Sequence, residues 1–368
     1  MTALLLCLVV VAADPPKPSA KAAEILQALH LEEGAKWQMY LDAAHKTKAE
    51  LNRKPIYIWT NPTRSGGQNE CVYASGSPAL VNPALLATRR AIILCGLPGD
   101  ADHRKLFGES VELLYDGLTH HHGFKAEDVH VLWPDAPVEK DGPAVKSTRD
   151  IATREAVAKS VEEIRAALTP SDALWVFVLG HGHYDARQSW LNLPGPDISH
   201  VEFGKLFADL VCKEQVFFIT TPCSGFYLKA LAQPGRIVIT ATEPDLEVNE
   251  TNFPHKLAKA IGSPPSYGEF DLDQDRHLTL LDLYLWAARE TAQEYASGEL
   301  AATEHAQIDD SGDGRGTELQ IDYLPEALGG RLRAGSNPPK PKGAGNLARK
   351  VFLDWPLSPP APLVGQEE

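Results

Sequence analysis

Two short motifs contain the side chains most suited to covalent chemistry, a histidine and a cysteine. The apolar run 173–178 leads into Leu179-Gly180-His181-Gly182-His183, and the run 215–220 leads into Thr221-Pro222-Cys223-Ser224-Gly225. Both runs have the length and the β-branched or aromatic content of buried strands. If the two strands are parallel neighbours, their carboxyl ends meet, and His181 and Cys223 face one crevice. A thiol and an imidazole placed together are the two groups that nucleophilic acyl transfer requires.

Residues around this pair would complete such a site. The backbone N–H groups of Gly182 and Cys223 are candidate donors to the oxyanion of a tetrahedral intermediate. His181 is the candidate general acid or base that delivers a proton to the leaving amine. A short helix expected over 224–232 would place Cys223 at a helix N-terminus, which lowers the pKa of a thiol. His183 lies further from the strand end, and Asp185 is typical of a solvated turn.

The elements that must position these residues alternate between strand and helix. Alternating strands and helices indicate right-handed crossovers, so we expect an α/β fold with a mostly parallel sheet and helices on both faces, in three layers. The expected strands are 91–96, 128–133, 173–179, 215–221 and 236–242, and the expected helices are 103–122, 148–168, 201–211, 224–232 and 252–261.

Composition narrows the function class. The 368-residue chain has 43% hydrophobic residues and a net charge of −14, which disfavours nucleic acid as a partner because phosphate binding needs a basic face. Residues 1–13 resemble a signal peptide cleaved before Asp14, so the expected location is secreted or periplasmic. No other segment is expected to span a membrane. The five cysteines lack the paired spacing of a zinc knuckle, and no cofactor is expected for catalysis.

The last third of the chain differs in composition from the α/β part. We expect a helical and irregular segment at 14–88, a catalytic domain at 89–262, an acidic helical region at 263–328 and a Pro/Gly-rich tail at 329–368. Within the acidic region, oxygen side chains occupy EF-hand loop positions one, three, five, nine and twelve, and a helix over 280–296 follows. These residues are Asp271, Asp273, Asp275, Thr279 and Asp282.

A second loop begins in the same way, with Asp309, Ser311 and Asp313. Both loops are candidate sites for structural Ca²⁺ in a small EF-hand-like appendage. The alternative is a solvated acidic loop in which Thr279 and Asp282 form a helix capping box. Arg276 stands where the EF-hand needs a glycine, and Gln320 stands at position twelve of the second loop.

An apolar strand ending in His-Gly, followed by an apolar strand ending in Cys, resembles the caspase/legumain-type cysteine peptidases, and bacterial legumain-like members most of all. The resemblance covers roughly 90–261. It implies a caspase-like fold, a dyad of His181 and Cys223, an oxyanion hole made by Gly182 and Cys223, and cleavage after one preferred residue, often Asn, Asp, Arg or Lys. The resemblance also matches Arg104 to a family residue that contributes to the specificity pocket, whereas Thr221-Pro222 replace the usual Glu-Ala.

The sequence therefore predicts a cysteine endopeptidase that acts on a peptide or protein through a thioester intermediate. One alternative is a non-catalytic module of the same fold, stabilised by calcium, which binds a partner without cleaving it. A second alternative is a cysteine-dependent α/β-hydrolase with His255 as its histidine, but only Gly225 of the two elbow glycines is present.

Overall fold

The computed structural model divides the chain into two compact units, residues Thr88–Trp355 and residues Met1–Ala87 with Pro356–Glu368. It describes residues 88–135, 145–244, 247–264, 267–275, 277–331 and 343–353, and three strands of the other unit. These strands, β1 (Gln38–Tyr40), β2 (Pro55–Trp59) and β3 (Cys71–Ser75), form an antiparallel sheet. The described part of segment 14–88 is therefore strand and not helix, and the expected signal peptide lies outside the described residues.

A seven-stranded sheet runs through the larger unit in the order β13-β12-β11-β7-β4-β5-β6. All neighbouring pairs are parallel except β12 and β13. The strands are β4 (Arg89–Cys95), β5 (Val129–Trp133), β6 (Asp150–Ile151), β7 (Ala173–Leu179), β11 (Glu214–Ile219), β12 (Arg236–Thr240) and β13 (Gln307–Asp309). The five strands expected from the apolar runs are confirmed, because strands buried on both faces are apolar throughout.

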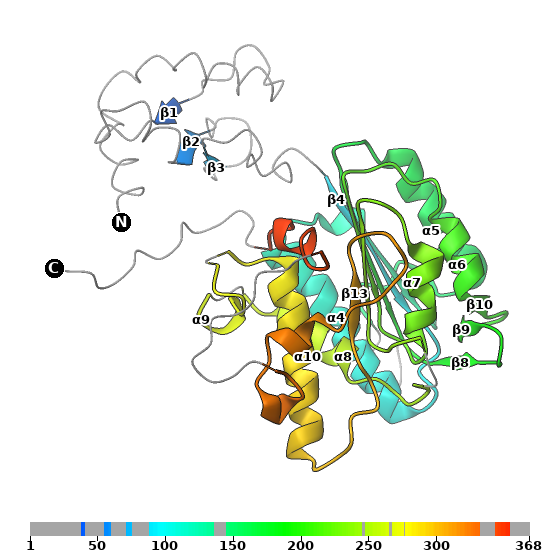
Figure 1. Cartoon of the computed structure of the whole chain (residues 1–368). Coiled ribbons are helices and arrows are strands. Elements are labelled where there is room, and N and C mark those ends of the chain that lie inside the picture. Colours follow the sequence, from blue (N-terminus) through cyan, green and yellow to red (C-terminus); the bar gives the residue numbers. More distant parts are fainter. Residues whose placement is uncertain are drawn as a thin grey trace. The chain divides into compact units, whose positions relative to one another are not determined.

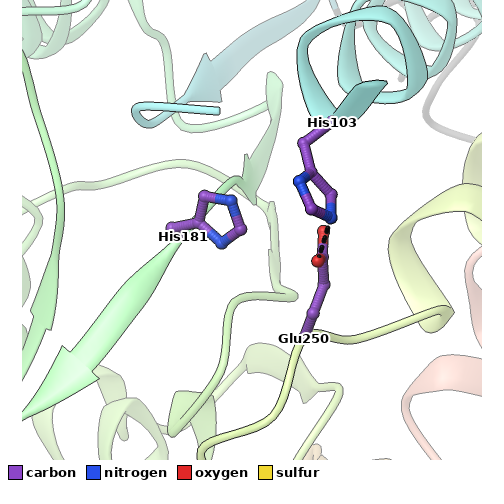
Figure 2. Close-up of side chains that lie close together, drawn as sticks. All are labelled: His103, His181 and Glu250. Carbon is purple, nitrogen blue, oxygen red and sulfur yellow. Dashed lines mark ion pairs between the residues drawn. The ribbon is translucent and has the colours of Figure 1, made fainter. Parts of the chain in front are cut away.

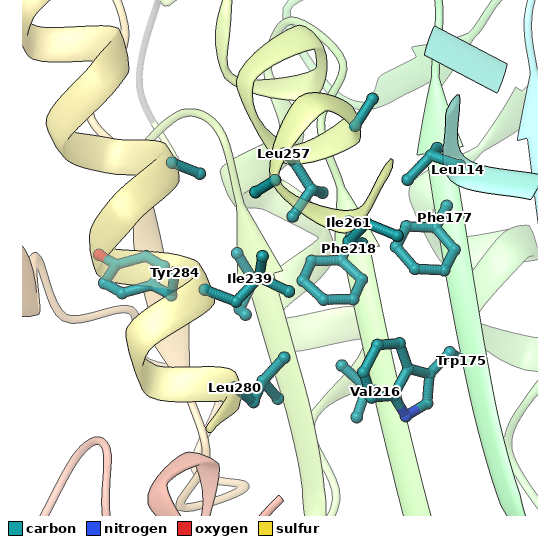
Figure 3. Close-up of a cluster of buried hydrophobic side chains, with 14 of the residues drawn as sticks. Leu114, Trp175, Phe177, Val216, Phe218, Ile239, Leu257, Ile261, Leu280 and Tyr284 are labelled. Atoms are coloured by element: carbon teal, nitrogen blue, oxygen red, sulfur yellow. The ribbon is translucent and has the colours of Figure 1, made fainter. Parts of the chain in front are cut away.

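Helices cover both faces of this sheet (Figure 1). On one face, α4 (Ala101–His121), α8 (Phe253–Gly262) and α10 (Leu280–Ser297) bury a core that includes Phe177, Phe218 and Tyr284 (Figure 3). On the other face, α5 (Arg154–Ala167), α6 (His200–Leu206) and α7 (Tyr227–Leu231) bury a second core around Phe217. The α/β class and the mostly parallel sheet between two helical layers are confirmed. None of the described helices is long and apolar enough to cross a membrane.

Local signals set where the helices begin. Asp100 caps α4 by accepting the N–H of His103 at 2.9 Å, and Thr153 caps α5 by accepting the N–H of Ala156. The helix expected from residue 148 begins only at Arg154, because residues 150–151 first pair with β5 as an edge strand. Residues 224–232 form a 3₁₀ turn, η6 (Ser224–Phe226), followed by the five-residue α7.

The last third packs onto the α/β core more closely than its composition suggests. A four-residue helix, α9 (Tyr267–Phe270), precedes the first acidic loop, and α10 follows that loop as predicted. In the expected tail, residues 343–353 pack against α10, with Ala348 and Val351 buried. The Leu280 N–H donates to Val351 O at 2.8 Å, and the Leu353 N–H donates to Leu278 O at 2.8 Å. This part of the tail is therefore ordered core, because its few apolar residues cover α10.

Candidate active site

The two chemical motifs follow neighbouring strands, as their sequence pattern predicted. β7 and β11 are parallel, with Val178 opposite Ile219, and the Thr220 N–H extends the ladder to Val178 O at 2.8 Å. Beyond the strands, Gly182 begins β8 (Gly182–Tyr184), which pairs with β9 (Ser189–Leu191), and β9 pairs with β10 (Ile198–Ser199). A Cβ atom on Gly182 would lie 3.3 Å from Pro222 O and 2.7 Å from Trp190 O. The two motifs are thus in contact, and only glycine fits between them.

The His181 ring has a defined tautomer. Its Nε2 lies 2.8 Å from Pro98 O, and a carbonyl oxygen can only accept, so Nε2 carries a hydrogen, and whenever the ring is neutral the lone pair is on Nδ1. The ring also meets His103 and Phe107 edge to face, with centroid separations of 5.1 and 5.7 Å. Gly99, at φ 81°, makes room for it, since a Cβ there would lie 3.0 Å from His181 Nε2. In its neutral form, the ring would therefore accept a proton at Nδ1.

Cys223 lies beneath a neighbouring segment of the chain. Its residue is fully buried at 0% exposure, and its backbone is left-handed, with φ 55° and ψ 25°. Its N–H donates to Glu247 O at 3.0 Å, and its Sγ lies 3.6 Å from the same oxygen. The backbone N–H expected to serve an oxyanion is therefore already engaged by a carbonyl in this conformation.

The electrostatic setting of the Cys223 thiol differs from the expectation. Burial, and after it the negative charge of Glu247, raise the thiol pKa above its ordinary value. The residue precedes a three-residue 3₁₀ turn and a five-residue helix, which are too short to supply a strong helix-end field. The expected lowering of the pKa by a helix N-terminus was wrong for this conformation, in which the thiol is protonated at neutral pH.

The segment over Cys223 is held in place by the Glu247 side chain. We call its described residues, 243–244 and 247–250, the covering segment. Glu247 forms an ion pair with the His305 ring, and its Oε2 accepts the N–H groups of Glu243 at 2.9 Å and His305 at 3.1 Å. Sequence reasoning missed Glu247 because its contact with Cys223 runs through a backbone carbonyl.

No hydrogen bond joins the Cys223 thiol to the His181 ring within the described ranges. The Nδ1–H of exposed His183 donates to Asn192 Oδ1 at 2.7 Å, so His183 takes no part in the contact between the motifs. Asp185 accepts the Trp190 Nε1–H at 2.9 Å and orients no imidazole. His255 contacts Ser110 Oγ at 2.8 Å through Nδ1, which favours a packing role over that of a hydrolase histidine.

Arg104, the candidate specificity residue, forms an ion pair with Asp135 beyond the end of β5. Its neighbour His103 is the residue that approaches His181. His103 Nε2 lies 2.5 Å from Glu250 Oε2, and its Nδ1 lies 2.9 Å from Asp100 Oδ2 (Figure 2). His103 could have been recognised from the sequence, because it lies in the first turn of the predicted helix. Glu250 belongs to the covering segment, where no sequence pattern marks it.

The first acidic loop only partly matches a calcium site. Asp271, Asp273 and Asp275 bring carboxylate oxygens within 4.8 Å of one another. However, the Arg349 guanidinium occupies this cluster, with Nε 2.7 Å from Asp273 Oδ2, and the Asp273 side chain is 0% exposed. A cationic side chain from the tail thus supplies the charge that a bound ion would supply.

The remaining expected calcium ligands are engaged in local structure. Asp282 and Thr279 form the capping box of α10, and Asp282 Oδ1 also accepts the Leu272 N–H at 2.9 Å. In the second loop Asp309 accepts four hydrogen bonds, from the Ser311 hydroxyl and from the N–H groups of Ser311, Gly312 and Gly314. Asp313 accepts the Arg315 N–H. The second loop also follows a strand and not a helix, so it lacks the entering helix of an EF-hand.

In comparisons of the sequence with known proteins, no family model and no curated protein matches the chain.

Proposed function

We propose that the chain is a cysteine endopeptidase of the caspase/legumain type, with Cys223 as nucleophile and His181 as general base and acid. The observation that carries the proposal is the placement of both residues directly after neighbouring parallel strands, β7 and β11. The strand order β5-β4-β7-β11-β12-β13, with only the last strand antiparallel, is compatible with a caspase-like fold. The Nε2–H bond from His181 to Pro98 O supports the same roles, because it leaves Nδ1 able to accept a proton.

The proposed reaction proceeds by acyl transfer. The Cys223 thiol gives its proton to His181 Nδ1, and the thiolate sulfur attacks the scissile carbonyl carbon. His181 then returns the proton to the leaving amine as the C–N bond breaks, which leaves a thioester on Cys223. Water adds to the thioester and releases the carboxylic acid and the thiol. The N–H groups of Gly182 and Cys223 are the proposed oxyanion donors.

Catalysis requires the covering segment to move. Cys223 is fully buried, and its N–H bonds to Glu247 O, so substrate and oxyanion both need the position that this carbonyl holds. When the segment moves away, burial and the Glu247 charge no longer raise the thiol pKa. The described conformation is therefore the resting form in this proposal, and a peptide or protein substrate is expected to bind the open form.

The test combines activity with labelling. Fluorogenic peptides with Asn, Asp, Arg or Lys before the scissile bond should report cleavage, with one residue preferred. Cys223→Ala and His181→Ala should each remove at least about 99% of kcat/KM, because the dyad acts as a unit. Cys212→Ser is the matched control, since Cys212 is half-buried and lies away from the motifs. Unchanged cleavage by Cys223→Ala would rule out the assignment.

The buried thiol and the engaged N–H also favour a second candidate, a binding module of the same fold without catalysis. Such a module would show no cleavage on the peptide panel, and iodoacetamide would label Cys223 no faster after the covering segment is loosened.

We further propose a secreted or periplasmic location. We also propose a peptide or protein as the partner in place of nucleic acid, because the net charge of −14 disfavours binding to phosphate groups.

A further inference from the structure

A cluster of three possible metal ligands lies beside the proposed dyad. One ring nitrogen each of His103 and His181 and one carboxylate oxygen of Glu250 lie within 4.8 Å of one another. The three residues come from the start of α4, the loop after β7 and the covering segment (Figure 2). All three are partly buried, so the cluster is shielded yet reachable from solvent. Two imidazoles and one carboxylate are a ligand set that proteins use for zinc.

The residues around this cluster orient both rings. Asp100 Oδ2 lies 2.9 Å from His103 Nδ1, which directs His103 Nε2 toward Glu250. Pro98 O lies 2.8 Å from His181 Nε2, which leaves the lone pair of His181 on Nδ1. Ligating histidines almost always donate their second ring N–H to a carboxylate or a backbone carbonyl. Each of the two histidines here has one such partner, so the cluster has outer contacts as well as candidate ligands.

We propose that His103, His181 and Glu250 bind a divalent transition metal of the zinc type, with water as the fourth ligand. Tetrahedral zinc with bonds of about 2.0–2.1 Å places its ligand atoms about 3.3 Å apart. The 2.5 Å contact between His103 and Glu250 would open by less than an ångström, and the other separations would close from at most 4.8 Å. These are side-chain adjustments. Calcium and magnesium do not fit, because they prefer oxygen ligands throughout.

Metal at this site would inhibit the peptidase, a consequence that rests on the proposed function. A metal bound to either ring nitrogen of His181 would prevent the ring from accepting the Cys223 proton, because Nδ1 would then either bind the metal or carry the ring hydrogen. Glu250 also belongs to the covering segment, whose Glu247 carbonyl contacts the Cys223 N–H at 3.0 Å. Coordination of Glu250 would hold that segment closed over Cys223 and exclude substrate as well.

Zinc binding can be measured on the full chain by competition with a chromophoric chelator, and Co²⁺ adds a visible spectrum that reports tetrahedral coordination. We expect one tight site in the wild type, with the tetrahedral cobalt spectrum. His103→Gln and Glu250→Gln should remove both signals. Asp100→Asn, which still caps α4, should weaken binding about 10–100-fold through the loss of a carboxylate partner. His183→Gln is the matched control, because exposed His183 bonds to Asn192 and should not alter binding.

The activity measurement separates this inference from the proposed function. For each variant, the cleavage rate in zinc is divided by the cleavage rate in a chelator. This ratio should be about 0.1 or lower in the wild type, because zinc inhibits it, and near one in Glu250→Gln. Zinc affinity unchanged by both ligand substitutions would overturn the metal site, even if the chain cleaves peptides. Binding lost as expected, in a chain that cleaves no peptide, would confirm the site and overturn the proposed function instead.

Discussion

The carbonyl oxygen of Glu247 accepts both polar hydrogens of Cys223, with its N–H at 3.0 Å and its thiol sulfur at 3.6 Å. Both donors are needed for the proposed chemistry, the thiol as nucleophile and the N–H as an oxyanion donor. A single carbonyl group therefore occupies the positions that substrate carbonyl atoms would take. The candidate nucleophile is inactive in this conformation because of one backbone contact, and the stability of that contact controls access to it.

Glu247→Ala should make Cys223 more accessible. The substitution keeps the covering carbonyl but removes the ion pair with His305 and two hydrogen bonds to backbone N–H groups. At about 1 kcal/mol for each of the two hydrogen bonds, the population of the open form should increase about 30-fold. The rate of Cys223 alkylation by iodoacetamide, followed by peptide mapping, should rise by the same factor.

Two controls accompany this measurement. Val248→Ala alters the same segment at a side chain that is 54% exposed, so its labelling rate should equal that of the wild type. Half-buried Cys212 is an internal reference in every sample, and its rate should not change. If Glu247→Ala and the wild type label Cys223 at equal rates, the side chain does not hold the segment closed.

Gly99→Ala should impair the proposed catalysis through the position of His181. A Cβ at Gly99 would lie 3.0 Å from His181 Nε2 and 3.2 Å from Cδ2, so the ring must move away. Displacement of a catalytic group by about 1 Å can reduce the rate about 100-fold, and the shift required here is a few tenths of an ångström, so we expect a loss of kcat/KM of about tenfold. Gly195→Ala separates this effect from backbone strain.

Gly99 and Gly195 have φ values of 81° and 87°, so alanine costs both positions about 1–2 kcal/mol in the left-handed region. Nothing lies within 4 Å of a Cβ at Gly195. Urea denaturation should therefore show similar destabilisation of the two variants, while only Gly99→Ala loses activity. Equal loss of activity in both variants would show that strain, and not contact with His181, is the cause.

The large-scale fold could be predicted from sequence because its strands are continuous apolar runs. Residues 173–179 and 215–219 are buried on both faces, so both segments are apolar at every position or nearly so and are recognisable as buried strands. β13 was missed for the opposite reason, since Gln307–Asp309 is short, polar in part and antiparallel. Its pairing with β12 depends on the intervening helices, and no local pattern encodes that dependence.

The residues of the candidate site were likewise predictable only in part. His181 and Cys223 could be found because each follows a recognisable strand, and adjacent parallel strands place their ends together. His103 and Glu250 lie 147 positions apart in the chain (250 − 103), and only the packing of α4 beside the covering segment joins them. The contact of Arg349 with Asp273 was not predicted either, because Arg349 lies in a stretch rich in Gly, Pro and Lys that has no recognisable pattern. Contacts between distant segments need the fold before they can be recognised.

Glu304 should make the protein less stable as the pH rises from about 4.5 to about 7. Its carboxylate accepts the N–H groups of Asn252 and Phe253 at 2.7 and 3.1 Å, and burial raises its pKa to about 7. Below about pH 4.5 the carboxyl is protonated in both the folded and the unfolded chain, and it adds no pH dependence there. Between pH 4.5 and 7 the unfolded carboxyl ionises first, so the free energy of unfolding falls by roughly 3 kcal/mol.

The neutral variant Glu304→Gln should lack this decline. The difference in unfolding free energy, Glu304→Gln minus wild type, should increase from pH 5 to pH 8 in urea titrations. Glu299→Gln removes an exposed carboxylate nearby and should follow the wild type at every pH. A difference that stays constant or falls with pH would contradict the raised pKa of Glu304.

In the acidic loop, the Arg349 guanidinium should neutralise the Asp273 carboxylate, which is the role that was expected of calcium. The Asp273 side chain is 0% exposed and that of Arg349 is 22% exposed, with 2.7 Å between Arg349 Nε and Asp273 Oδ2. Removal of one partner from a buried ion pair leaves an uncompensated charge and costs about 3–5 kcal/mol. Arg349→Gln should therefore lower the free energy of unfolding by about 3 kcal/mol, and the double variant Asp273→Asn/Arg349→Gln should recover part of that loss.

Calcium provides the discriminating measurement for this pair. With a millimolar dissociation constant, 10 mM calcium would stabilise a binding protein by about 1.4 kcal/mol. We expect no such effect on the wild type, because Arg349 already neutralises Asp273 and Asp282 caps α10. In Arg349→Gln, Asp273 and Asp275 lose the guanidinium that pairs with them, so 10 mM calcium should restore part of the stability. Stabilisation of the wild type by calcium, but not by equal magnesium, would instead assign the loop to calcium.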